Sequence, residues 1–81
     1  MKILVVGASG MIGSTVLRVM SENKDWEVFG TIRSASVKHF FPAEIAERLV
    51  NGVDVEYPDA LMKVLDAIRP NVVINCAGLT K

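Results

Sequence analysis

The sequence predicts a three-layer α/β fold in which helices cover both faces of a small parallel sheet. Short apolar runs alternate with segments of helical periodicity along the whole chain, which is the pattern of parallel strands joined by helical crossovers. The apolar runs are continuous, as expected for strands buried on both faces. Hydrophobic residues make up 51% of the 81 residues, which excludes a disordered chain. Right-handed crossovers favour the strand order 3-2-1-4.

Two strands and one helix are expected in the first half of the chain. The run 3–6 is rich in β-branched residues and ends at Gly7, which favours a buried strand. From Met11 onward, apolar residues recur at three- and four-residue spacing, which is the period of an amphipathic helix. The polar stretch 23–25 separates this helix from a second apolar run. We therefore expect a strand over 3–6, a helix over 11–23, a strand over 27–32 and a loop over 33–41.

The second half of the chain is expected to contain two helices and two strands. Pro42 favours a short helix, because proline fits the first helical position. Pro58 and Pro70 bound a longer segment with one apolar face, and a final apolar run follows it. We therefore expect a helix over 42–47, a strand over 49–53, a helix over 58–69 and a strand over 72–76.

Three evenly spaced glycines follow the first expected strand. Gly7 would turn the chain off the strand, Gly10 would let a ligand approach the backbone, and Gly13 would allow close packing of helix and strand. The amide groups of residues 10–13 would lie at the start of the helix, where they can bind phosphate. A strand before the loop and a helix after it predict a Rossmann-type dinucleotide site, and no Gly-Lys-Ser/Thr follows to suggest a P-loop. The alternative is a glycine-rich turn in an unrelated α/β domain. The predicted cofactor-binding residues of this loop are Gly7, Ser9, Gly10, Met11, Ile12 and Gly13.

The residues after the second expected strand bear on the choice of nucleotide. NAD-binding domains of this type place a carboxylate there to hold the ribose 2′-hydroxyl, whereas this chain has Arg33 and Ser34. A guanidinium matches a 2′-phosphate. We therefore expect NADP(H) to be preferred and NAD(H) to remain possible, with Arg33 as the anchor and Ser34 as a helper. The alternative is that Arg33 is an ordinary solvated loop residue.

Glycines at 7, 10 and 13, together with the run Asn75-Cys76-Ala77-Gly78, resemble the motifs of the extended and atypical short-chain dehydrogenase/reductases. Within that family the stretch 69–80 is similar to the Arg-Pro-Asp-Val-Val-Ile-Asn-Ala-Ala-Ala-Tyr-Thr run of dTDP-4-dehydrorhamnose reductases, which reduce a nucleotide-linked 4-keto sugar with NAD(P)H. The chain departs from that subfamily at Leu79, where tyrosine is usual, and at Met11, where glutamine is frequent. These departures concern the substrate and not the cofactor.

The resemblance implies two further groups of cofactor contacts. Cys76, Ala77 and Gly78 would let the backbone pass the cofactor's ribose, because ligands bind outside the carboxyl ends of parallel strands. Asp54 would accept a hydrogen bond from the adenine amine, and Val55 would cover the ring. A turn aspartate with purely local hydrogen bonds is an equally good interpretation of Asp54.

The resemblance also implies a catalytic Tyr-x-x-x-Lys pair, which this chain lacks. Tyr57 is the one tyrosine, and Leu61 stands four residues after it. We therefore expect no catalytic residue within 1–81, and interpret the chain as the N-terminal part of an NAD(P)-binding Rossmann domain, a fragment without the catalytic and substrate-binding parts. The expected function is the NADP(H)-binding portion of an oxidoreductase acting on a nucleotide-linked sugar. A non-catalytic NAD(P)-sensing module and a bare scaffold for protein contacts remain alternatives.

Charge and composition limit the remaining partners. Nine basic and nine acidic residues give a formal net charge of zero without a basic stripe, so no nucleic-acid partner is expected. Gly7 ends the first apolar run too early for a signal peptide or a membrane span, so we expect no membrane partner and a cytoplasmic location. Cys76 is the single cysteine, so it cannot form a disulfide within the chain, and we expect no metal site. We interpret it as a small buried residue of the last strand. The apolar edge of the strand over 72–76 predicts self-association.

Overall fold

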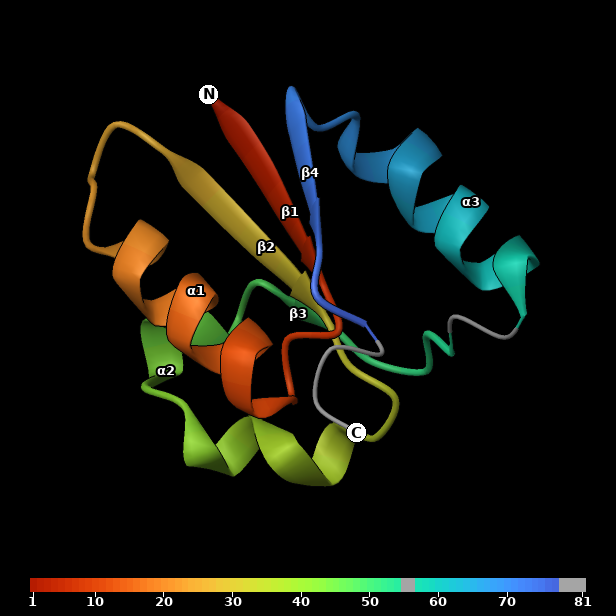
Figure 1. The fold of residues 1–81 in the computed structure, drawn as a ribbon, viewed down its shortest axis with the longest axis horizontal. Coiled ribbons are helices and arrows are strands. Elements are labelled where there is room, and N and C mark those ends of the chain that lie inside the picture. The colour runs from red at the N-terminus through yellow and green to blue at the C-terminus, as the bar shows by residue number, and fades with distance from the viewer. Residues whose placement is uncertain (55–56, 78–81) are drawn as a thin grey trace.

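Four parallel strands form the sheet of the computed structural model, which describes residues 1–54 and 57–77 (Figure 1). Their order is β3-β2-β1-β4, which confirms the predicted α/β class and the order 3-2-1-4. Strand β1 is central and pairs with β2 from Lys2 opposite Glu27 and with β4 from Ile3 opposite Val72. The elements are β1 (Lys2–Val6), α1 (Met11–Ser21), β2 (Glu27–Thr31), the 3₁₀ helix η1 (Ala35–Phe40), α2 (Ala43–Ala46), β3 (Leu49–Val50), α3 (Pro58–Ile68) and β4 (Val72–Asn75).

The central strand is buried on both faces, and its side chains divide the core in two. Ile3 and Val5 belong to the cluster beneath α1 and α2, whereas Leu4 and Val6 belong to the cluster beneath α3. This division follows from the two-residue period of a strand. Figure 1 shows α1 and α2 on one side of the sheet and α3 on the other. The continuous apolar run of β1 is therefore explained by the two helical layers that cover it.

The segment over 33–41, which we expected to be a loop, contains the 3₁₀ helix η1. Ser34 caps this helix, since its side chain accepts a hydrogen bond from the Ser36 amide at 3.3 Å. Arg18 of α1 holds the other end, where its guanidinium donates to the Phe40 carbonyl at 3.0 Å and lies 5.3 Å from the centre of the Phe41 ring. The expectation of a loop was wrong because this order comes from a cap and a tertiary contact and not from apolar periodicity.

Several elements are shorter than the sequence pattern predicted. Helix α1 ends at Ser21 because the chain turns at Asn23, whose side chain accepts from the Asp25 amide at 2.9 Å. Strand β3 ends at Val50 because Gly52, with a φ of +77°, turns the chain. The other elements differ from the predicted bounds by one residue at one or both ends: β1 begins at Lys2, β2 ends at Thr31, α2 spans Ala43–Ala46, α3 ends at Ile68 and β4 ends at Asn75. Within the described residues, no helix has the length and apolar character needed to cross a membrane.

Candidate functional site

The predicted site residues of the described chain follow the carboxyl ends of the four strands. Figure 1 shows these ends converging at one edge of the sheet, where the chain leaves β1 and enters α1. In a parallel sheet all strands point the same way, so the segments that follow them share this edge. The fold therefore brings together parts of the chain that are up to about seventy residues apart in the sequence.

The loop after β1 is fastened to β2 by Thr31. The Gly7 amide donates to the Thr31 hydroxyl oxygen at 3.0 Å, and the Ala8 amide donates to the Thr31 carbonyl at 2.8 Å. Thr31 is only 1% exposed and is the buried polar residue among the described part of the chain. Sequence reasoning treated it as an ordinary strand residue, although a hydroxyl at the end of a buried apolar strand is a signal for such a tie.

Gly7 is also closely packed on the side away from Thr31, where only a residue without a side chain fits. Its φ is +80°, and a Cβ there would lie 2.9 Å from both the nitrogen and the Cα of Ala77. Ala77 follows β4 and is held by Asn75, whose side-chain oxygen accepts from the Ala77 amide at 3.0 Å. Gly7 is therefore enclosed between the end of β2 and the turn after β4, and both neighbours fix its place.

Gly13 lies where α1 approaches the loop. Gly13 is the third residue of α1 and is buried. A Cβ there would collide with the carbonyl oxygen of Gly7 and lie 3.2 Å from the Cα of Ala8. The role predicted for Gly13, close packing of helix and strand, is found in a slightly different form: the helix packs against the loop that leaves the strand. Any larger residue would push the start of α1 away from the loop.

The start of α1 carries free amide groups and no competing charge. Gly10 is the N-cap, in extended conformation, and no side chain caps the helix there. The first turn has no acidic residue, Met11 is 80% exposed and Ile12 is 44% exposed. The N–H groups of the first helical residues therefore face a positive and accessible helix end, which suits a phosphate. The Gly10 amide, which we expected among them, donates to the Gly7 carbonyl at 3.3 Å, and Ser9 is exposed in the loop.

The segment after β4 presents backbone and not side chains to the same edge. The Cys76 amide donates to the Val6 carbonyl at 2.9 Å, which extends the pairing of β4 with β1. The Cys76 side chain is 4% exposed and packs in the core beneath α1. A contact of Cys76 with a cofactor would therefore come from its backbone. Ala77 is half-buried beside Gly7, and Gly78 lies outside the described residues.

Arg33 and Asp54, predicted for two different parts of the nucleotide, lie beside each other. Arg33 Nη1 is 3.9 Å from Asp54 Oδ2, and the two side chains are 74% and 30% exposed. The hydroxyl of Ser34 is engaged in the cap of η1 and lies 2.8 Å from the hydroxyl of Ser36. Val55 lies outside the described residues. The corner formed by the ends of β2 and β3 thus holds one exposed guanidinium and one more sheltered carboxylate.

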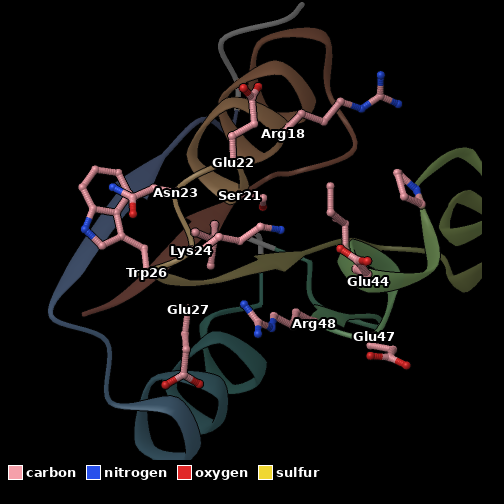
Figure 2. A pocket seen from close by; sticks show the side chains of 13 residues that line it. Arg18, Ser21, Glu22, Asn23, Lys24, Trp26, Glu27, Glu44, Glu47 and Arg48 are labelled. Atoms are coloured by element: carbon pink, nitrogen blue, oxygen red, sulfur yellow. The ribbon is translucent and has the colours of Figure 1, made fainter.

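A hollow lies away from this edge, at the amino end of β2 (Figure 2). Its volume is about 460 Å³, and it lies between the end of α1, the start of β2 and α2. Three basic and four acidic side chains line it, so their charges nearly cancel and do not select a strongly charged ligand. Its lining includes Arg18, Glu22, Lys24, Trp26, Glu27, Glu44, Glu47 and Arg48.

Comparison with known proteins relates the chain to nucleotide-dependent enzymes. The model of the NAD dependent epimerase/dehydratase family matches residues 3–81. The GDP-6-deoxy-D-talose 4-dehydrogenase of Aggregatibacter actinomycetemcomitans is 31% identical over 80 residues, which cover 99% of this chain and 22% of that protein. The 4-hydroxy-tetrahydrodipicolinate reductase of Myxococcus xanthus (strain DK1622) is 38% identical over 73 residues, which cover 89% of this chain and 27% of that protein. No solved structure gives a significant match.

The family match covers nearly the whole chain, and the chain spans about a quarter of the length of these curated relatives. The loop geometry agrees with the match, because close packing at Gly7 and Gly13 and an uncapped start of α1 are expected of the glycine loop of a dinucleotide-binding domain. The chain therefore belongs to the NAD dependent epimerase/dehydratase family, whose cofactor is a nicotinamide dinucleotide, in agreement with the resemblance to the extended short-chain dehydrogenase/reductases.

Proposed function

We propose that this chain forms the cofactor-binding part of an NADP(H)-preferring oxidoreductase. The observation that carries the proposal is the loop at residues 7–13, which is anchored to Thr31, enclosed by Ala77 and followed by an uncapped helix. The pyrophosphate would lie against the first amides of α1, because backbone donors and the helix dipole both favour an anion there. Gly7 and Gly13 would keep the loop in the shape that presents these amides, because a Cβ at either position would collide with Ala77 or with the Gly7 carbonyl.

The preference for NADP(H) depends on the corner after β2. Arg33 is exposed there, and the carboxylate usual in NAD-binding domains is absent from the end of β2. A guanidinium would form charge-assisted hydrogen bonds with a 2′-phosphate, whereas a plain ribose would find no acceptor for its 2′-hydroxyl on this strand. The description of the family names NAD as the cofactor. Arg33 would therefore place this chain among members that use the phosphorylated nucleotide.

The reaction class follows from what the two relatives have in common. One is named as a dehydrogenase of a nucleotide-linked deoxysugar and the other as a reductase of a hydroxylated tetrahydrodipicolinate, so their substrates differ while both names describe redox chemistry. Residues matched by both relatives would serve the shared cofactor and not either substrate. We propose a nucleotide-linked sugar as the substrate of the whole protein, similar to that of dTDP-4-dehydrorhamnose reductases, because the stretch 69–77 follows that sequence pattern.

A titration with both nucleotides tests the cofactor proposal. The protein is titrated with NADPH and with NADH by calorimetry, as wild type and as Arg33→Ala. Because a hydrogen bond to a charged group contributes about 1.5–3 kcal/mol, the affinity ratio of NADPH to NADH should fall by about tenfold or more in the variant. Arg48→Ala is the matched control, since Arg48 lines the hollow at the amino end of β2, and its removal should leave the ratio unchanged.

Two results would contradict the proposal in different ways. If neither nucleotide binds to the wild-type protein, the loop is not a dinucleotide site. If both bind and Arg33→Ala leaves the ratio as it was, the loop holds the cofactor but Arg33 does not select NADP(H). The substrate proposal is tested separately by supplying nucleotide-linked 4-keto sugars to the whole protein, of which this chain would be the cofactor-binding part, and following the oxidation of NADPH by its absorbance. Turnover is expected, and its absence in a whole protein that binds NADPH would exclude these substrates.

A further inference from the structure

The ends of β2 and β3 are held together beyond their last paired residues. The Val53 amide donates to the Ile32 carbonyl at 3.1 Å, and the Gly52 amide donates to the Arg33 carbonyl at 3.3 Å. Ile32 is 1% exposed and Val53 is 4% exposed, so both anchors lie in the core. Arg33 and Asp54 each follow one of these anchors directly. Their side chains therefore extend from a fixed corner, which explains the 3.9 Å between the guanidinium and the carboxylate.

We propose that Asp54 determines nucleotide specificity by weakening the attraction of Arg33 for a 2′-phosphate. The inference deepens the proposed function and rests on it. Asp54 Oδ2 lies 3.9 Å from Nη1 of Arg33, which is an ion pair without a hydrogen bond, so the carboxylate neutralises part of the guanidinium charge. An incoming 2′-phosphate brings between one and two negative charges to the same place and is repelled by the carboxylate.

The exposures of the two side chains suit this role. Arg33 is 74% exposed, so its donors are accessible to a ligand from solvent. Asp54 is 30% exposed, so its charge is less screened by water than that of a fully solvated carboxylate. The pair itself contributes little to folding, because exposed ion pairs are weak. Its effect is on the ligand, since any anion that reaches Arg33 also comes close to Asp54.

The adenine contact that the family resemblance implies for Asp54 can be separated from this effect. Adenine is present in both nucleotides, so a change in that contact alters both affinities by the same factor and leaves their ratio unchanged. The 2′-phosphate is present in one nucleotide only. A change in the ratio therefore reports on the phosphate and Arg33, and not on adenine.

The experiment measures binding of 2′,5′-ADP and 5′-AMP, which differ only in the 2′-phosphate, to the wild type and to Asp54→Asn. Asparagine keeps the size and an oxygen acceptor but removes the charge. The affinity ratio of 2′,5′-ADP to 5′-AMP should rise by about three- to tenfold at low salt, and the rise should shrink as salt screens the charges. Asp54→Ser is a second neutral variant, and Asp66→Asn, an exposed carboxylate of α3, is the control.

The same titrations in an Arg33→Ala background show whether Asp54 acts through Arg33. In that background the repulsion alone remains, so the rise caused by Asp54→Asn should be clearly smaller than in the wild type. An unchanged or lower ratio in both neutral variants would overturn the inference, and so would a rise of the same size at high salt. If Arg33→Ala lowers the ratio while the Asp54 variants do not raise it, the inference fails and the proposed function stands. If neither NADPH nor NADH binds to the wild type, both fail.

Discussion

Replacing Thr31 by valine should release the loop that carries Gly7. Valine has the shape of threonine and is favoured in strands, so β2 and the surrounding core should be retained. The change removes the hydroxyl oxygen that accepts from the Gly7 amide at 3.0 Å, while the carbonyl of residue 31 still accepts from the Ala8 amide. The loop would therefore keep one of its two ties to β2 and lose the one nearer to the turn.

The expected size of the effect follows from the burial of the pair. A partly buried N–H that loses its acceptor costs about 1–3 kcal/mol, whereas burying a methyl group in place of a hydroxyl recovers up to about 1 kcal/mol. The net loss in the free energy of unfolding should be about 1–2 kcal/mol. For a chain of 81 residues this corresponds to a fall in Tm of roughly 4–15 °C.

Stability alone does not identify the hydrogen bond, so the assay needs a matched variant. Thr31→Ser keeps the hydroxyl and loses the methyl group, and should itself destabilise the protein by about 1 kcal/mol. The two variants differ at the Gly7 amide, whose hydrogen exchange should become about five- to thirtyfold faster in Thr31→Val than in Thr31→Ser, after correction for global stability. Nuclear magnetic resonance resolves this single amide.

The reasoning would be refuted by equal exchange of the Gly7 amide in the valine and serine variants. It would also be refuted by a valine variant that is as stable as the wild type, because the amide would then have found another acceptor at no cost. In either case the place of the loop would depend on the contact with Ala77 and on the backbone bond of Ala8, and not on the Thr31 hydroxyl.

Two further predictions concern close packing and the sheet edge. Gly13→Ala should lower the free energy of unfolding by about 1–3 kcal/mol in urea denaturation, because its Cβ would collide with the Gly7 carbonyl. Calorimetry should show NADPH and NADH binding weakened by the same factor. Thr15→Ala, at an exposed position of the same helix, is the control for both measurements. An equally stable Gly13→Ala protein would contradict the packing. Val73 lies on the edge strand β4 and is 48% exposed, so the protein should self-associate at high concentration in sedimentation, and Val73→Lys should reduce this more than Val19→Lys on α1. A wild-type protein that sediments only as a monomer would exclude this interface.

The parts of the fold that depend on side-chain periodicity could be predicted from the sequence. The apolar run of β1, its glycine boundary and the amphipathic patterns of α1 and α3 determined the element order and the strand order. Gly7 could be placed in a turn because its role is purely conformational, and its φ of +80° confirms it. These features depend on single residues or on a repeated spacing, which are visible in one dimension.

The features that sequence reasoning missed depend on pairs of residues from different elements. From the sequence, Thr31 is an ordinary strand residue, and only the fold shows that its hydroxyl accepts a hydrogen bond from the Gly7 amide. The helix η1 reads as a loop until Arg18 of α1 reaches the Phe40 carbonyl. A cap such as Ser34 with Ser36 is a local signal that could have been used, whereas the other two contacts require the three-dimensional register of α1 and β2.

The anchoring of Gly7 links the stability of the fold to the binding of the nucleotide. The loop lies between Thr31 at the end of β2 and Ala77 after β4, and β1 pairs with both of these strands. A pyrophosphate at the start of α1 would bind only when the loop is in place, so the nucleotide would stabilise the same arrangement that these neighbours stabilise. The strand order β3-β2-β1-β4 therefore also shapes the site. Because β2 and β4 lie on either side of β1, Thr31 and Ala77 both contact Gly7.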